Sequence, residues 1–229
     1  MKDVLGQALS DYYQQFKGRR LWVHNKYGPK EKMPVHVYFR EPDEMPELEW
    51  MALQQCKGSI LDIGAGAGSH SLCLQKMGLD ITALDISPKA AEVMRLRGVQ
   101  KALCQDFFAL EGDTYDTLLL LMNGIGLSGT LAGLRQFLAQ ARRLLRPGGR
   151  LIFDSSDIAY LYDGKIPDME GYYGEILYQY EYRKEWSDWF NWLFIDQALL
   201  KEISASEGWS VRILLEDPFD QYLAVLQIA

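Results

Sequence analysis

Short apolar runs alternate with helically spaced apolar positions through the centre of the chain. Five of these runs have the length of strands: residues 59–63, 79–84, 99–104, 116–122 and 150–154. Between them, apolar positions recur with helical spacing at about 69–77, 89–97 and 131–145. This alternation predicts an α/β fold with a doubly wound parallel sheet and right-handed crossovers.

Residues with strong backbone preferences mark the ends of these elements. Ser87 is expected to cap the second helix, with Pro88 in its first turn and Gly98 at its end. The third helix is expected to stop at residues 146–149, Arg-Pro-Gly-Gly, which turn the chain into the fifth strand. These signals support the order of strands and helices.

The two flanks decorate this core. The N-terminal flank is expected to hold a helix at about 4–16, a hairpin through 21–24 and 35–40, and a helix near 46–56. We expect residues 1–57 to form a cap on a cofactor-binding domain of residues 58–229.

The C-terminal flank adds antiparallel structure. Residues 175–183 alternate like a strand with Tyr178 and Tyr180 on one face, and the chain is expected to return antiparallel within an insertion at about 172–195. Three elements follow: a helix capped by Asp196, and strands at 210–216 and 221–228. The prediction is a mostly parallel seven-stranded sheet with a C-terminal antiparallel strand, plus N-terminal and β-hairpin decorations.

Composition narrows the class of protein. The chain has 229 residues, is 48% apolar and 24% charged, and carries a net charge of -7, which disfavours a nucleic-acid partner. No apolar run approaches the roughly 20 residues of a membrane span, and the N-terminus lacks a signal-peptide core. The scattered Cys56, Cys73 and Cys104 are expected to be buried free thiols. We therefore expect a cytoplasmic protein.

The glycine-rich stretch after the first strand carries the most chemical information. Residues 61–70, Leu-Asp-Ile-Gly-Ala-Gly-Ala-Gly-Ser-His, follow the carboxyl end of a strand, where open α/β sheets bind ligands. The loop reads G-x-G-x-G, with Ser69 in place of the third glycine of a dinucleotide fingerprint. Asp62 would repel a pyrophosphate, but it suits a ligand with an ammonium and a sulfonium, such as S-adenosylmethionine (SAM).

Two further acids stand at the ends of the next strands. Asp85 ends the second strand, where a carboxylate can accept hydrogen bonds from both ribose hydroxyls. NAD enzymes share this feature, so alone it does not discriminate. Asp106, followed by Phe107, ends the third strand and can accept from an adenine amine. Three acids at three successive strand ends are more specific than any one.

With these motifs the sequence resembles the class I SAM-dependent methyltransferases over about residues 57–154. Residues 62–68 resemble the family's first motif, Asp85 its ribose acid, Asp106 its adenine-side acid, and residues 146–149 its turn into the fifth strand. The resemblance implies SAM as cofactor and S-adenosylhomocysteine (SAH) as product. No metal is expected, since no His/Asp cluster stands near the loop after the fourth strand. The implied cofactor-binding residues are Asp62, Gly64, Ala65, Gly66, Gly68, His70, Asp85, Ile86, Asp106, Phe107, Met122 and Asn123.

The loop after the fourth strand lies where this family places the acceptor. Asn123 is followed by Gly124, so the Asn/Asp-Pro-Pro-Tyr/Phe signature of amino-group methyltransferases is absent, as is a Pro-Cys pair for cytosine-C5 chemistry. Both absences disfavour DNA as acceptor. Asn123 either lines the pocket or stabilises a turn. Tyr12 and Arg40 are further catalytic candidates, since related small-molecule methyltransferases use the N-terminal segment as a lid.

Histidines and aromatic residues leave alternatives open. His70 is either a pocket wall or base, or a half-exposed helix residue; His24 and His36 are expected to be structural, with no acidic partner at metal spacing. The aromatic side chains of the flanks either wall an apolar or cationic acceptor or pack on the sheet: Tyr12, Tyr13, Trp22, Tyr38, Tyr172, Tyr173, Tyr178, Tyr180, Tyr182, Trp186, Trp189 and Trp192.

The sequence thus predicts methyl transfer to a nitrogen or oxygen of a small-molecule acceptor, without a nucleic-acid or membrane partner; the oligomeric state stays open. Because the sulfur of SAM already activates the methyl group, a general base is needed only when the acceptor arrives protonated. The alternatives are a protein methyltransferase, a non-catalytic SAM-binding module, and a nicotinamide oxidoreductase, which Asp62 and Ser69 disfavour.

Overall fold

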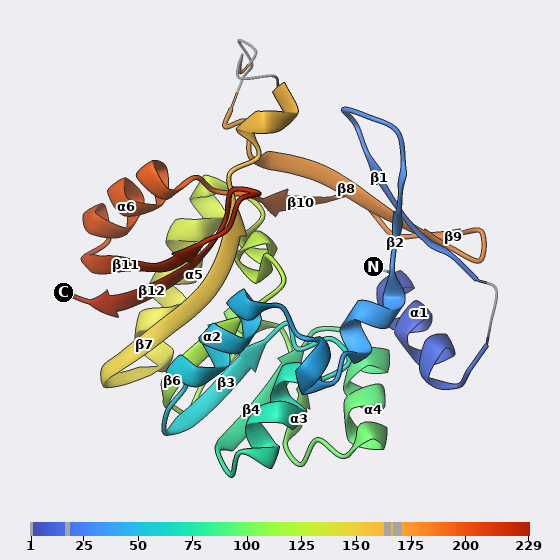
Figure 1. The fold of residues 1–229 in the computed structure, drawn as a ribbon, viewed down its shortest axis with the longest axis horizontal. Helices are drawn as coiled ribbons and strands as arrows, with labels where there is room; N and C mark the ends of the chain where they lie inside the picture. The colour runs from blue at the N-terminus through green and yellow to red at the C-terminus, as the bar shows by residue number, and fades with distance from the viewer. Residues whose placement is uncertain (1, 17–18, 163–165, 167–170) are drawn as a thin grey trace. The chain divides into compact units, whose positions relative to one another are not determined.

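A computed structural model describes residues 2–16, 19–162, 166 and 171–229 (Figure 1). The α-helices are α1 Val4–Tyr13, α2 Glu47–Gln55, α3 Ser69–Lys76, α4 Pro88–Arg97, α5 Leu131–Leu144 and α6 Gln197–Ser206. Short 3-10 helices are η1 Val35–Phe39, η2 Pro42–Glu44, η3 Phe107–Ala109, η4 Gly124–Ser128 and η5 Ala159–Tyr162. Ser87 caps α4 with Pro88 in its first turn, and Gly98 ends it, as predicted.

The strands form two sheets in the part of the chain that the structure describes. The strands are β1 Leu21–Asn25, β2 Glu31–Met33, β3 Ser59–Ile63, β4 Asp80–Asp85, β5 Ala102–Cys104, β6 Tyr115–Leu120, β7 Leu145–Ser156, β8 Glu175–Tyr182, β9 Glu185–Trp186, β10 Phe190–Leu193, β11 Trp209–Glu216 and β12 Gln221–Ile228. The seven-stranded sheet has the order β11-β12-β7-β6-β3-β4-β5. This confirms the predicted mostly parallel sheet with an antiparallel C-terminal strand.

The chain divides into two compact units. Unit 1 comprises residues 1–45, 61–110 and 177–190, and unit 2 comprises residues 46–60, 111–176 and 191–229. Both units draw on separated stretches of the sequence. The division into a cap of residues 1–57 and a domain of residues 58–229 stays a prediction.

In unit 1, β4 and β5 pair in parallel, with Leu84 opposite Leu103. Their cover is built from small side chains: Ala65, Ala83 and Ala91 pack with Met94 and Val99. Small residues allow helix α4 to approach the strands closely. Helix α1 lies against α4 (Figure 1), so the N-terminal helix belongs to the same core.

Unit 1 also contains antiparallel pairs from distant segments. Strand β1 pairs with β2 on one side and with β8 on the other. The predicted hairpin is therefore partly wrong, because β1 pairs with residues 31–33 and not with 35–40. Pro34 follows β2 directly and has no N–H for a ladder, and residues Val35–Phe39 turn into the 3-10 helix η1.

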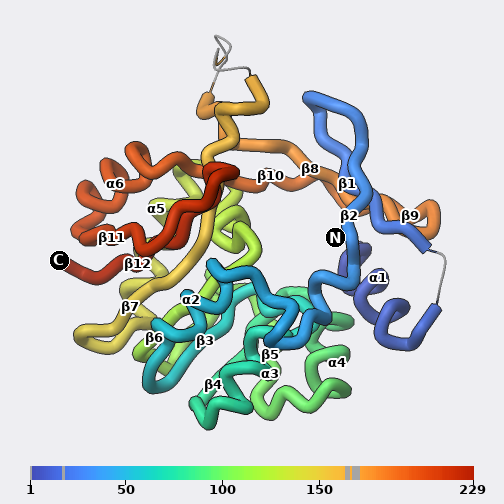
Figure 2. Tube along the Cα trace, in the orientation of Figure 1, coloured from blue at the N-terminus to red at the C-terminus, as the bar shows by residue number. Residues whose placement is uncertain are grey.

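Unit 2 carries the antiparallel end of the large sheet. Figure 2 shows β7, β12 and β11 running side by side. Strand β6 pairs in parallel with β7, β7 pairs antiparallel with β12, and β12 with β11, with a register shift between Ile213 and Leu215. Consecutive residues are apolar and buried at 118–120 of β6 and 151–153 of β7. Both faces of these two strands are therefore covered there, as expected for inner strands.

The structure also bears on the expected state of the cysteines and on the expected absence of a membrane span. Cys56 and Cys73 are buried free thiols, but Cys104 is exposed, since it ends the edge strand β5. Among the helices of the described ranges, none has the length and apolar character needed to cross a membrane.

Candidate functional site

The glycine-rich loop joins β3 to α3 in unit 1. The N–H groups of Gly64 and Ala65 both donate to the carbonyl of Leu84, at 2.8 and 3.0 Å, which fixes the loop against β4. Gly66 has a φ of +58°, and a Cβ there would lie 3.1 Å from Cδ1 of Tyr38. A side chain at this position would therefore be strained and crowded, so the loop requires glycine.

Asp85 lies at the end of β4, next to this loop. Its two carboxylate oxygens accept hydrogen bonds from the backbone N–H groups of Gly66 and Ser87, each at 2.8 Å. Burial raises the pKa of Asp85 to about 6, against the effect of these two N–H donors. The structure thus brings the predicted ribose acid and the glycine loop together.

Asp62 and His70 lie on the inner side of the loop. Asp62 is buried and accepts a hydrogen bond from Ser71 Oγ at 2.6 Å, in the first turn of α3. Burial raises the pKa of Asp62, and nearby His70 lowers it. His70 is buried as well, so the expectation of a half-exposed helix residue is wrong. The hydrogen bond from Ser71 ties Asp62 to the first turn of α3.

The adenine-side residues are more open. Asp106 is exposed and caps η3, where its carboxylate accepts from the N–H of Phe108 at 3.0 Å. Phe107, also predicted from the sequence, is buried and packs edge-on against Phe108. Ile86 is 70% exposed, beside Asp85. An exposed apolar side chain next to a carboxylate suits a ligand with a flat base and a sugar.

These residues fit SAM. Glycine at position 66 presents backbone without a side chain beside the Tyr38 ring, and Asp85 offers carboxylate oxygens as acceptors for ribose hydroxyls. Among the residues that the structure describes, no group of three or more His, Cys, Asp or Glu side chains is placed to hold a metal.

Met122 and Asn123 belong to unit 2 and open the loop after β6. Both are non-glycine residues in the left-handed region, with φ of +65° and +55°. The N–H of Asn123 donates to Oδ2 of Asp154 at 2.8 Å, and its Oδ1 accepts from Ser156 Oγ at 2.9 Å. Strained backbone of this kind persists only where its surroundings hold it, and it clusters at functional positions.

Asp154 is the fully buried carboxylate that holds this loop. Its Oδ2 also accepts from Gln221 Nε2 at 2.6 Å, whereas its Oδ1 has no hydrogen-bond partner among the described residues. Burial raises the pKa of Asp154 to about 6, and the N–H of Asn123 and the Gln221 amide oppose that shift. Sequence reasoning missed this residue, although a single acid directly after an apolar run of a strand indicates a buried carboxylate.

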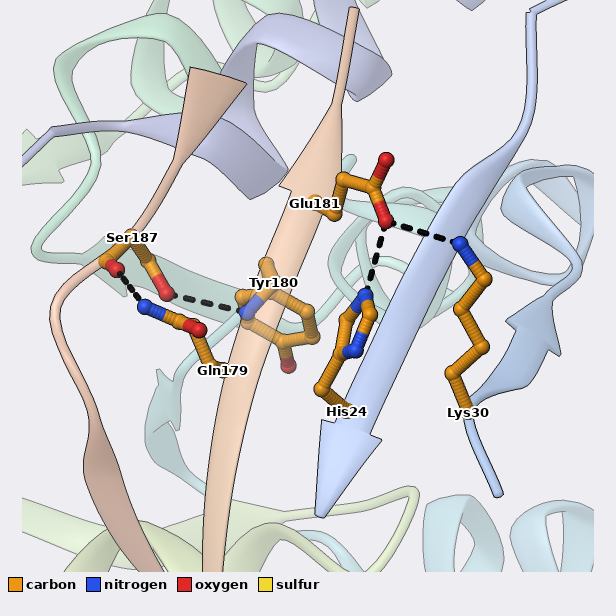
Figure 3. Close-up of polar contacts among 6 residues, drawn as sticks. All are labelled: His24, Lys30, Gln179, Tyr180, Glu181 and Ser187. Carbon is orange, nitrogen blue, oxygen red and sulfur yellow. Dashed lines mark hydrogen bonds and ion pairs between the residues drawn. The ribbon is translucent and has the colours of Figure 1, made fainter. Parts of the chain in front are cut away.

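A third carboxylate network lies on the small antiparallel sheet of unit 1 (Figure 3). Glu181 Oε2 contacts His24 Nε2 at 2.8 Å and Lys30 Nζ at 3.0 Å. The acidic partner of His24 lies on the remote strand β8, so it could not be read from the local sequence. Successive side chains of a strand point to opposite faces, so Glu181 faces away from the side that Tyr180 occupies.

The N-terminal candidates lie around η1. Tyr12 packs on Phe39 with ring centroids 4.7 Å apart and is 45% exposed, and Arg40 caps the end of η1. His36 is exposed within η1. The structure places the ring of Tyr38, one of the flank aromatics named from the sequence, against the glycine loop. The roles of Tyr12 and Arg40 stay predictions.

The chain is similar to a solved methyltransferase over its whole length. A family model described as "Methyltransferase domain" matches residues 61–153. The crystal structure of a SAM-dependent methyltransferase from Bacteroides fragilis, in complex with SAH, has 40% sequence identity and a TM-score of 0.93. The similarity covers 100% of this chain and 95% of that one.

Two curated relatives match the central part of the chain. Demethylmenaquinone methyltransferase from Tropheryma whipplei (strain Twist) is 28% identical over 98 residues, which is 41% of this chain and 39% of that protein. A ubiquinone biosynthesis O-methyltransferase from Cereibacter sphaeroides is 30% identical over 100 residues, with the same two shares. The match thus spans about two fifths of the length of these relatives.

Proposed function

Because the chain belongs to the class I SAM-dependent methyltransferases, we propose that it transfers a methyl group to a nitrogen or oxygen of a small-molecule acceptor. The observation that carries the proposal is Asp85, held beside the glycine loop by two backbone N–H donors. The two curated relatives are named for quinone substrates, which are small molecules. The net charge of -7 disfavours a nucleic-acid acceptor.

We propose that the predicted cofactor residues of unit 1 bind SAM. When bound, SAM supplies a methyl group on a positively charged sulfur. Asp85 accepts hydrogen bonds from the ribose, Ile86 and Asp106 contact the adenine, and Gly64, Gly66 and Gly68 let the cofactor lie against the backbone. Asp62 and His70 contribute by holding the loop and the start of α3.

In unit 2 we propose that Asn123 orients the acceptor. Its Oδ1 accepts a hydrogen bond from Ser156 Oγ, which fixes the orientation of the side-chain amide. The Nδ2 group is therefore a donor that points in one direction. Such a donor positions an oxygen or nitrogen for attack without a general base. Asn123→Ala is expected to slow methyl transfer about tenfold or more, whereas Ser156→Ala is expected to have a smaller effect.

The experiment that tests the acceptor class uses SAM with a radiolabelled methyl group. A cell extract is separated by ultrafiltration into a small-molecule fraction and a protein fraction, and each is incubated with the protein. Label in small molecules, lost in the Asp85→Asn variant, is expected. Label confined to the protein fraction would show a protein methyltransferase. SAH binding with no transfer to either fraction would favour a non-catalytic module.

A further inference from the structure

The 3-10 helix η1 lies directly against the cofactor loop within unit 1. Ser69 Oγ donates a hydrogen bond to the carbonyl of Tyr38 at 2.8 Å. The Tyr38 ring is the neighbour that a Cβ at Gly66 would meet, at 3.1 Å from Cδ1. Val35, Tyr38 and Phe39 also pack on a core that includes Ala67 of the same loop. Tyr38 therefore borders the space beside the Gly66 backbone, on the side where the cofactor would bind.

Arg97, at the end of α4, ties this segment to the loop. Its Nη1 donates to the carbonyl of Ala67 at 2.7 Å and to Ser69 Oγ at 3.1 Å, and it lies 3.5 Å from the carbonyl of Tyr38. Its guanidinium also stands 5.0 Å from the centre of the Phe39 ring. One side chain thus fixes the position of Tyr38 relative to the glycine loop.

A second tyrosine approaches from strand β8. Tyr180 pairs with Val23 of β1 and lies on the face of the strand that also carries the buried Tyr182, against the core of Leu21 and Val4. Burial raises the pKa of both Tyr38 and Tyr180, and the nearby Asp85 carboxylate raises them further. Val35 of η1 packs on the same core as Tyr180, and it also packs with Tyr38 on the core of Ala67, so the two tyrosines lie on either side of η1's contact with the glycine loop.

We propose that Tyr38 and Tyr180 are further cofactor-binding residues. The ring of Tyr38 forms a wall of the cofactor site beside Gly66, and the hydroxyl of Tyr180 joins Asp85 in binding the ribose. A phenol both donates and accepts, so Tyr180 can complement a carboxylate that only accepts. The proposal rests on the cofactor and on family membership, and it is independent of the acceptor.

The test is calorimetric titration with SAH, which needs no acceptor. Tyr38→Ala is expected to weaken SAH binding about tenfold, and Tyr38→Phe less than about threefold, because phenylalanine keeps the ring. Tyr180→Phe is expected to weaken binding by roughly 2- to 12-fold, the range for one hydrogen bond. The effects of these variants separate a ring contact from a hydroxyl contact.

Two matched controls guard against a merely structural effect. Val35→Ala removes packing from the core that Tyr38 shares, and Tyr13→Phe removes a hydroxyl bonded to the carbonyl of Leu96. Both are expected to bind SAH within about twofold of wild type. Unfolding in urea shows which variants remain folded.

Two results would overturn the proposal. One is wild-type SAH affinity in folded Tyr38→Ala and Tyr180→Phe variants. The other is an equal loss of affinity in Val35→Ala and Tyr38→Ala, which would assign the effect to packing of η1. A failure of the acceptor proposal would leave all of these affinities unchanged, so the two failures are distinguishable.

Discussion

Asp85 in unit 1 and Asp154 in unit 2 are both carboxylates whose pKa burial raises to about 6, but their surroundings differ. Asp85 is bonded by two backbone N–H groups close to it in the fold and lies beside the exposed Ile86. Asp154 is fully buried, with its Oδ1 unbonded among the described residues. The first arrangement suits an acid that meets a ligand, and the second an acid that holds a loop.

The largest expected effect is the loss of cofactor binding on changing Asp85. Asp85→Asn removes the charge that receives the ribose hydroxyls, and we expect SAH affinity to fall about 10- to 150-fold, since a hydrogen bond to a charged group contributes roughly 1.5–3 kcal/mol. Calorimetric titration measures the affinity. The matched control is Asp80→Asn, at the exposed start of the same strand, which is expected to bind SAH normally.

The outcome of this pair of variants decides whether Asp85 is the ligand-facing acid. Wild-type SAH affinity in a folded Asp85→Asn variant would mean that the carboxylate only closes the turn between Gly66 and Ser87. A comparable loss in Asp80→Asn would point to a general effect of charge on the fold.

Asp154 is expected to contribute to the pH dependence of stability, alongside Asp85, whose pKa burial raises to the same value. Asp154 holds its proton in the native state with a pKa of about 6, against 3.8 for an ordinary aspartate, so ionisation costs stability. The penalty is absent below about pH 4, grows between pH 4 and 6, and is complete above, at about 3 kcal/mol in order of magnitude. Asp154→Asn should reduce the change in the free energy of unfolding between pH 5 and pH 7, which urea unfolding at the two pH values measures.

The exposed Asp80 supplies the control again, because Asp80→Asn should keep the wild-type slope. SAH binding by unit 1 residues is expected to survive in Asp154→Asn. An unchanged pH slope in Asp154→Asn would argue that this carboxylate is not the buried proton acceptor.

A smaller effect is expected from the loop that Asp154 holds. A Cβ on Gly126 would lie 2.0 Å from the indole Nε1 of Trp192, so Gly126→Ala should destabilise by roughly 1–3 kcal/mol through overpacking. Gly28→Ala is the matched control, because a Cβ there would meet only Asn25, at 3.6 Å. Urea unfolding measures both. If the clash is the cause, Gly126→Ala should cost less in a Trp192→Leu background.

Cofactor-side features could be predicted because their signals are local. The glycine spacing after β3, the Ser87 cap with Pro88, and Asp85 at a strand end all lie within short stretches of sequence. Backbone preferences and apolar runs decide such features almost independently of the rest of the chain. The order of strands and helices followed from the same signals.

The features that sequence reasoning missed depend on contacts between distant residues. Asp154 holds Asn123 from 31 residues away, and Glu181 holds His24 from 157 residues away. The contact of Tyr38 with Gly66 could not be predicted either, because residues 35–40 have the pattern of a strand and Pro34 decides otherwise. Tertiary packing supplied these features, and a single sequence carries no direct record of it.

The smallest expected effect sharpens the comparison with a carboxylate of the opposite kind. The pKa of Glu181 is lowered, first by its hydrogen bond with His24 and then by Lys30. Its contribution to stability is therefore present above the ordinary glutamate pKa and is lost as the pH falls through the lowered value. Because the network is partly exposed, Glu181→Gln should cost no more than about 1 kcal/mol at pH 7.

Glu181→Gln should also leave SAH affinity unchanged, because Glu181 lies on the opposite face of β8 from Tyr180. Urea unfolding and calorimetric titration measure the two quantities on one preparation, with Tyr180→Phe as the variant that should show the reverse pattern. Weakened SAH binding in Glu181→Gln, at unchanged stability, would place this network with the cofactor and remove the distinction between the two faces. Unchanged binding would leave Asp85 as the acid that faces the ligand and Glu181 as one that fastens β8 to β1.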